Sequence, residues 1–217
     1  EGFIWLSKQM DAMGGEQAYR EKVNELSGVM GREAVGKAFA NGHYDFQNTL
    51  QFLADNGFDM LNTLVNTYGK EAVAAAFTHE DGDFTELLKS VAVLGEDNLA
   101  KINAFAGKDK MIALMTGDPR SCACFLQMLA KDNDIEKFKE NYEAVVDVFG
   151  ADTIQASFEK DPCGVVYLAQ VCGDMGVDAF SGFMNDFEDI LGKDNTLVLL
   201  EQNPAVLSMY IFVADEE

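Results

Sequence analysis

Four cysteines and two histidines are the residues whose side chains could act as nucleophiles, redox groups or metal ligands. They are Cys122, Cys124, Cys163, Cys172, His43 and His79. A structural zinc site usually contains a Cys-x-x-Cys pair or a histidine near the cysteines in sequence, and this chain has neither. We interpret the cysteines as buried structural thiols, with a disulfide or a redox role as the alternative.

The sequence contains no other motif that is typical of catalysis or metal binding. The acidic segments Glu80-Asp81-Gly82-Asp83 and Asp132-Asn133-Asp134 lack the ligand spacing of a calcium loop. Phosphate-binding loops, the Gly-x-Ser-x-Gly nucleophile motif and dinucleotide fingerprints are also missing from the sequence. We therefore predict no catalytic residue and no metal site, and we predict that the protein is not an enzyme.

The charge of the chain restricts its partners. It contains 37 acidic and 16 basic residues, which gives a formal net charge of −21. Such a charge repels nucleic-acid phosphates and anionic membrane surfaces. It favours a protein partner with a basic face, and the alternative is that the acidity serves only solubility.

A recurring glycine organises the helices that would position any site. It occurs at Gly31, Gly69, Gly107, Gly150 and Gly192, at intervals of 38, 38, 43 and 42 residues. Eight residues after each glycine comes a large apolar side chain: Phe39, Phe77, Met115, Phe158 or Leu200. A nearly constant period of this size is typical of helical repeat proteins. We predict an all-α fold, an α-solenoid-like array of about five degenerate repeats of 38–43 residues.

The three prolines mark a second break within the repeat. Pro119, Pro162 and Pro204 each lie twelve residues after a repeat glycine, and His43 and Asp81 occupy this place in the first two copies. The residue before a proline is kept out of the helical conformation, whereas proline itself suits the first turn of a helix. Each break is therefore expected to end one helix and to open the next.

The predicted array covers residues 1–217 as a single helical-repeat domain, with partial repeats at both ends. The chain begins at Glu1 rather than Met, which a cleaved targeting segment would explain and a shortened chain would explain equally. Apolar residues gather at both ends, and we predict Phe3, Trp5, Tyr210 and Phe212 as partner-binding residues. The alternative is that these ends fold back on their neighbours. The apolar runs are shorter than the roughly 20 residues of a membrane-spanning helix.

The last repeat carries a family resemblance. Residues 197–207 contain Asn203-Pro204-Ala205-Val206-Leu207 after an apolar helix, and this segment resembles the repeat of mitochondrial transcription termination factor-like proteins. It is also similar to Asn-Pro-x-Val-Leu helical repeats of algal plastid proteins. The resemblance implies an organellar helical-repeat fold and favours a plastid location. Termination factors bind nucleic acid through a basic groove, which a net charge of −21 does not provide, so no site residue is transferred.

These observations favour a non-enzymatic scaffold or adaptor that packs against other protein subunits. The resemblance makes an accessory or linker subunit of a plastid photosystem-antenna complex one form of this hypothesis, with peripheral association through a membrane complex. The alternative is a binding module for an apolar small molecule, a pigment or a lipid, because Phe and Met also line such pockets. Organellar nucleic-acid binding is less favoured. No cofactor is predicted beyond that bound pigment or lipid.

Overall fold

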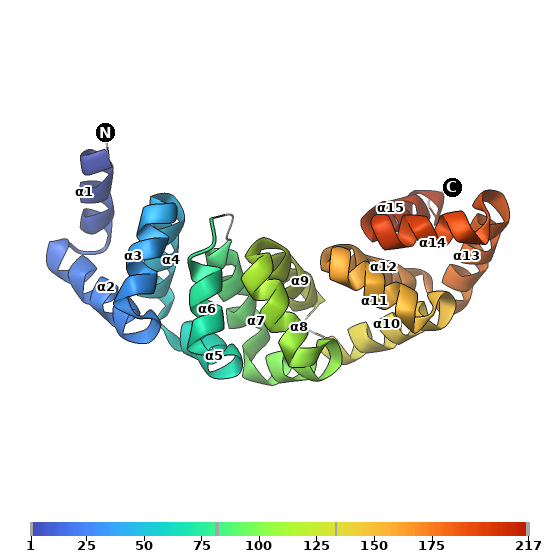
Figure 1. The fold of residues 1–217 in the computed structure, drawn as a ribbon, viewed down its shortest axis with the longest axis horizontal. Helices are drawn as coiled ribbons and strands as arrows, with labels where there is room; N and C mark the ends of the chain where they lie inside the picture. The colour runs from blue at the N-terminus through green and yellow to red at the C-terminus, as the bar shows by residue number, and fades with distance from the viewer. Residues whose placement is uncertain (1, 81–82, 133, 216–217) are drawn as a thin grey trace. The chain divides into compact units, whose positions relative to one another are not determined.

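The structure, a computed structural model, describes residues 2–80, 83–132 and 134–215, and statements about side chains leave out residues 2–6, 131–132, 209 and 212–215. Throughout this part of the chain the backbone forms helices and short connections, and no strand occurs in it (Figure 1). The prediction of an all-α fold is confirmed. The α-solenoid-like array of five repeats stays a prediction.

Each of the five recurring glycines lies directly before a helix. All five have φ between 83° and 91°, and four of them combine it with ψ between 144° and 150°. This combination is available essentially only to glycine, which explains the residue type at these positions. The helices that follow are α3 (Arg32–Asn41), α6 (Lys70–Phe77), α8 (Lys108–Gly117), α11 (Ala151–Lys160) and α14 (Lys193–Gln202).

The predicted second break is also present in the four copies whose break residue is described, before α4 (His43–Asn56), α9 (Pro119–Asp132), α12 (Pro162–Met175) and α15 (Pro204–Asp215). In the second copy the predicted break residue, Asp81, lies outside the described residues, and α7 (Phe84–Ile102) begins after it. Asp118, Asp161 and Asn203 have φ between −144° and −150°, as expected for a residue before proline. The carboxylate of Asp161 accepts a hydrogen bond of 2.9 Å from the backbone N–H of Gly164, so Asp161 caps α12.

A third group of helices ends at the recurring glycines. It consists of α2 (Glu16–Met30), α5 (Asp59–Tyr68), α10 (Ile135–Phe149) and α13 (Val177–Leu191). In the third copy the corresponding helix is the second half of α7, which follows a kink at Gly95, where φ is 71°. It continues into the π-type segment η1 (Asn103–Gly107), which ends at the recurring glycine. The first helix of the chain is α1 (Gly2–Ala12).

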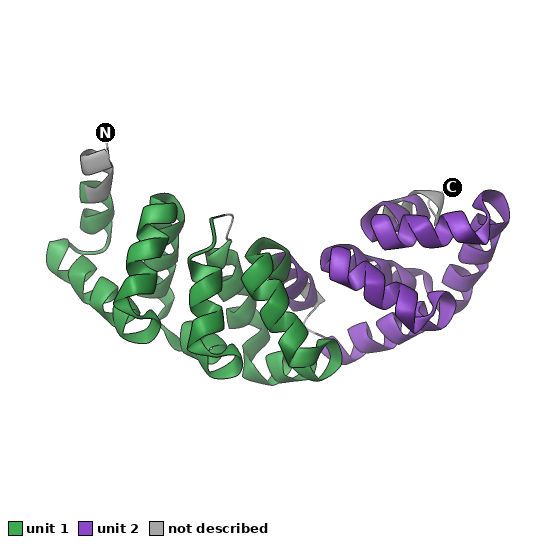
Figure 2. Cartoon of the chain, in the orientation of Figure 1, with its two compact units in different colours: residues 1–123 green, residues 124–217 purple. Residues whose placement is uncertain are grey.

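The chain divides into two compact units, residues 1–123 and residues 124–217 (Figure 2). In unit 1, α6 packs on α3 and α8, and α5 packs on α7. In unit 2, α12 packs against both α10 and α15, and α11 packs on α14. The single helical-repeat domain of 217 residues stays a prediction.

Apolar side chains fill the interior of each unit. In unit 1 the rings of Phe46, Phe77 and Phe84 follow one another at centroid distances of 6.2 and 5.1 Å. In unit 2 the buried rings of Phe125 and Phe158 meet edge to face at 5.4 Å. Among the apolar residues that come eight after a repeat glycine, Phe77, Met115, Phe158 and Leu200 are buried, whereas Phe39 is exposed. Within the described residues, no helix has both the length and the apolar character to cross a membrane.

Candidate protein-binding surface

The predicted partner-binding residues are placed only in part. Tyr210, on α15, has 59% of its surface exposed, as expected for a partner-binding residue. The side chains of Phe3, Trp5 and Phe212 lie outside the described residues. Tyr210 alone therefore guides the search for a surface.

Exposed apolar side chains are concentrated around Tyr210 in the sequence. Between 38% and 78% of the surface is exposed for six large apolar residues of α13, α14 and α15: Val177, Ile190, Leu191, Val198, Val206 and Tyr210. We refer to these six residues as the C-terminal apolar surface. Sequence reasoning identified only Tyr210 among them, because apolar residues at helical spacing are usually buried.

Helix α13 contributes half of the C-terminal apolar surface because its apolar stripe is wider than the side that its neighbours cover. Phe180 and Met184 are fully buried. Phe183 and Phe187, one turn apart on the same helix, are only half-buried, and their rings stack at a centroid distance of 6.0 Å. Ile190 continues this line at i, i+4 and i+7 and is the most exposed of the six.

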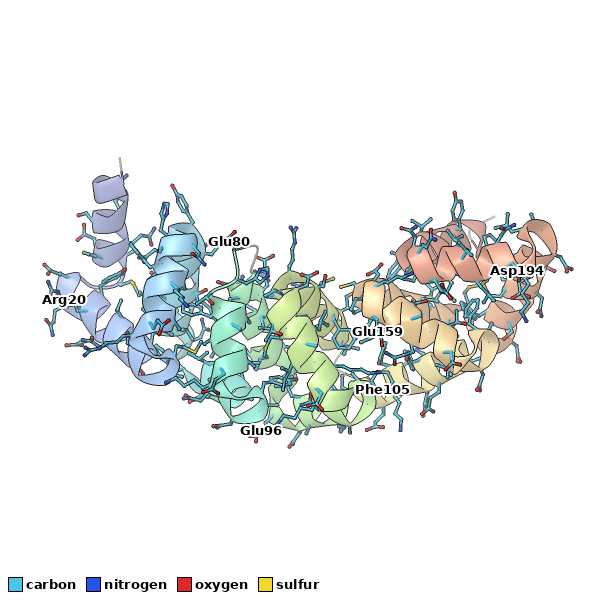
Figure 3. The ribbon with its side chains drawn as sticks, in the orientation of Figure 1. Arg20, Glu80, Glu96, Phe105, Glu159 and Asp194 are labelled. Atoms are coloured by element: carbon cyan, nitrogen blue, oxygen red, sulfur yellow. The ribbon has the colours of Figure 1, made fainter. Side chains whose placement is uncertain are left out.

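The surroundings of these apolar side chains are acidic. Residues 177–210 contain six acidic residues and one basic residue, Lys193. On α13, the helical period places Asp186 at one edge of the apolar stripe and Glu188 at the other. Asp194 is exposed in the first turn of α14 (Figure 3). Glu96 on α7 and Glu159 on α11, which the same figure labels, are exposed acidic residues elsewhere in the chain. An apolar surface with acidic edges is suited to a partner with apolar and basic side chains.

A second group of residues brings a cysteine, an aspartate and a histidine near one another: Cys122, Asp118 and His79. Burial, with a smaller contribution from Asp118, raises the pKa of the Cys122 thiol to about 12. Burial also disfavours ionisation of Asp118, but hydrogen bonds from Ser121 and the proximity of His79 outweigh it, so the pKa of Asp118 is lowered. A reactive cysteine needs a lowered pKa. This environment therefore keeps the Cys122 thiol protonated at neutral pH.

The four cysteines separate into two classes, which gives a first testable prediction. Cys122 and Cys172 are buried, which confirms the interpretation for these two, whereas Cys124 and Cys163 are half-buried. Raising the pKa of Cys122 from 9.0 to about 12 lowers its thiolate fraction on the order of a thousandfold at neutral pH. We expect iodoacetamide to modify Cys124 much faster than Cys122 in the folded protein, measured by mass spectrometry of the digested chain.

The same raised pKa sets the direction of a pH effect on stability. The unfolded chain releases the Cys122 proton first, so the contribution of the protonated thiol is complete below about pH 9 and is lost as the pH rises toward 12. Denaturant unfolding should therefore show a falling free energy of unfolding over this alkaline range, and a smaller fall in Cys122→Ala. For the alkylation experiment described above, equal rates for Cys122 and Cys124 would contradict the buried environment of Cys122.

The cavities formed by the described residues have polar or charged side chains among their lining residues. A cavity of about 130 Å³ lies between α9, α10 and α12, next to Asp134, Lys137 and Asn141. Pockets for drug-sized ligands usually measure about 300–1,000 Å³ and are mostly apolar. A groove of about 560 Å³ between α3 and α6 is large enough, but Arg32 and Lys70 are among the charged residues that line it.

Neither metal sites nor relatives add a second candidate. Within the described ranges there is no group of three or more His, Cys, Asp or Glu side chains arranged to hold a metal ion. Comparison of the chain with protein-family models, with curated proteins and with solved structures finds no match. The C-terminal apolar surface is therefore the candidate site that the geometry supports best.

Proposed function

We propose that the protein is a non-enzymatic scaffold or adaptor that binds another protein through the C-terminal apolar surface. The observation that carries this proposal is the exposure of six large apolar side chains on three neighbouring helices of a chain whose net charge is −21. Large apolar side chains that are exposed on adjoining helices are a feature of protein-binding sites. The expected partner is a protein subunit with apolar and basic side chains.

The energetics favour a specific contact. Burial of one large aliphatic or aromatic side chain contributes about 1.5–3 kcal/mol. A few such residues usually carry most of the binding free energy of a protein interface, and Tyr is enriched among them. The acidic residues around the surface accelerate encounter with a basic partner and disfavour acidic ones.

A plastid photosynthetic complex is the concrete form of this proposal. The similarity of residues 197–207 to plastid helical repeats supports it, and so does the acidic, helical character of the chain. In this form the protein is an accessory or linker subunit between photosystem and antenna proteins. In this form the protein does not enter the membrane and associates with it only peripherally, by binding to the membrane complex.

The test is native mass spectrometry of the tagged protein isolated under mild conditions from its source. We expect a partner subunit at fixed stoichiometry with the wild type, and its loss from the Tyr210→Asp variant. Val93→Asp is the matched control, since Val93 is an exposed apolar residue on α7 in unit 1. A lone species with the mass of one tagged chain, or a partner retained by Tyr210→Asp as well as by the wild type, would overturn the proposal.

A further inference from the structure

Helices α10 and α13 have the same length and the same place before a recurring glycine, but one face of α13 is less buried than the corresponding face of α10. Each has 15 residues and ends at a glycine with positive φ, Gly150 or Gly192. The first residue of α10, Ile135, is 4% exposed, whereas the first residue of α13, Val177, is 46% exposed. The last residues, Phe149 and Leu191, differ in the same way, with 7% and 40%.

Helix α12 covers α10. The two helices pack along each other, and the side chain of Asn141 in α10 lies against Gly173 in α12. A side chain at Gly173 would collide with Asn141, since an added Cβ would come within 2.7 Å of its Cγ. The small residue on α12 therefore allows the close approach that buries the face of α10.

The equivalent face of α13 carries larger apolar residues and remains half-open. Counted from the first residue of each helix, Asn141 corresponds to Phe183 and the fully buried Val145 corresponds to Phe187. Both phenylalanines are half-buried. The apolar stripe of α13 therefore follows the same spacing as the face of α10 that α12 covers, but more of its apolar surface remains exposed.

We infer that this face of α13 receives an amphipathic helix of a partner protein, seated as α12 is seated on α10, with Lys or Arg along its flanks. The inference rests on the proposed function and specifies the partner that it calls for. Phe183, Phe187 and Ile190 form a ridge at i, i+4 and i+7, which fits the groove between side chains of another helix. Because Phe is larger than Asn, small residues are expected opposite Phe183, as Gly173 is opposite Asn141.

Charge identifies the partner as basic rather than as a second copy of this chain. Asp178, Asp186, Glu188 and Asp189 lie on α13 itself, which carries no basic residue. Two copies joined through this face would bring both sets of carboxylates together, and like charges across an interface oppose association. Lys or Arg beside the apolar stripe of a partner helix would neutralise them instead.

Synthetic peptides test the inference directly. The first peptide is an amphipathic helix of about 18 residues, or five turns, with a Leu and Ala stripe and lysines on its other face. The second has the same composition in scrambled order, and the third has glutamates in place of the lysines. We expect the first alone to bind, with a Kd in the micromolar range by fluorescence anisotropy, and to slow amide exchange in residues 177–191.

The Ile190→Glu variant separates apolar contact from charge attraction. We expect it to weaken binding of the lysine peptide at least about tenfold, because the substitution puts a carboxylate into the apolar ridge. Pure charge attraction would give the opposite sign, since the variant is more acidic. Val93→Glu in unit 1 adds the same charge at an exposed apolar position elsewhere and should leave binding unchanged. The folding of both variants is checked by circular dichroism.

The outcomes distinguish this inference from the proposed function. Equal binding of the scrambled peptide, preference for the glutamate peptide, or undiminished binding to Ile190→Glu would each overturn the basic-helix inference. Absence of binding by all three peptides would overturn it as well. If a partner still co-purifies and depends on Tyr210 in those cases, the proposed function stands with another kind of partner. If no partner co-purifies, the proposed function fails whatever the peptides do.

Discussion

Replacing Gly164 with valine should lower the free energy of unfolding of unit 2 by about 3 kcal/mol, as forced overpacking of a tight helix contact does. Helix α15 crosses Gly164 so closely that an added Cβ would lie 2.7 Å from the backbone nitrogen of Ala205 and from Cγ of Pro204. The same Cβ would collide with the carboxylate of Asp161, which caps α12. Backbone and proline ring atoms cannot rotate away, so α12 and α15 must separate.

Gly182→Ala is the matched control for this prediction. Gly182 is exposed in the interior of α13, and an added Cβ would meet nothing within 4 Å. Alanine in a helix interior is favoured over glycine by about 1 kcal/mol, so this variant should be slightly more stable than the wild type. Denaturant unfolding followed by circular dichroism measures both changes. A Gly164→Val variant as stable as Gly182→Ala would show that α15 does not pack on α12 in this way.

The Phe125→Ala variant should lose about 3–5 kcal/mol of stability, the usual cost of emptying a large aromatic site in a core. Phe125 is completely buried, and its ring meets the edge of the Phe158 ring at a centroid distance of 5.4 Å. The loss combines the transfer of the ring into water with the cavity left beside Phe158. Amide exchange should accelerate in α11, because this helix carries Phe158, and in α12.

Phe39→Ala makes the same chemical change at an exposed position and serves as the control. Phe39 lies on α3 in unit 1, has 43% of its surface exposed, and forms an edge-to-face ring contact with Phe46. Its removal is expected to cost less than about 1 kcal/mol, since little apolar surface is newly exposed. Similar losses for the two variants would contradict the burial that distinguishes them.

Helix boundaries were the part of the fold that the sequence predicted best. Glycine at a positive φ and proline in a first turn are local backbone requirements, so Gly150 and Pro162 reveal the starts of α11 and α12 without knowledge of the packing. The kink at Gly95 is of the same local kind, since its φ is 71°. The π-type turn of η1 was not predicted, because hydrophobic periodicity does not distinguish a π-type turn from an α-helical one.

Burial was predicted less well because periodicity shows which face needs a cover and not whether it has one. Phe187 and Leu191 on α13 follow the same spacing as Val145 and Phe149 on α10, and only the latter pair is buried. The candidate surface therefore became visible only in the structure. Tyr210 was predicted from its place near the end of the chain, whereas the exposure of Ile190 had no signal in the sequence that distinguished it from a core residue.

The side-chain hydrogen bonds between helices have a consequence for how the chain folds. Tyr19 to Gln47, Thr49 to Thr85 and Gln170 to the Met128 carbonyl join residues 28, 36 and 42 apart. Closing a loop of 42 residues rather than 28 costs only about 0.4 kcal/mol more in chain entropy. Helices joined across 28 to 42 residues are both present before the whole chain has been made. Packing of these helices can therefore begin during synthesis.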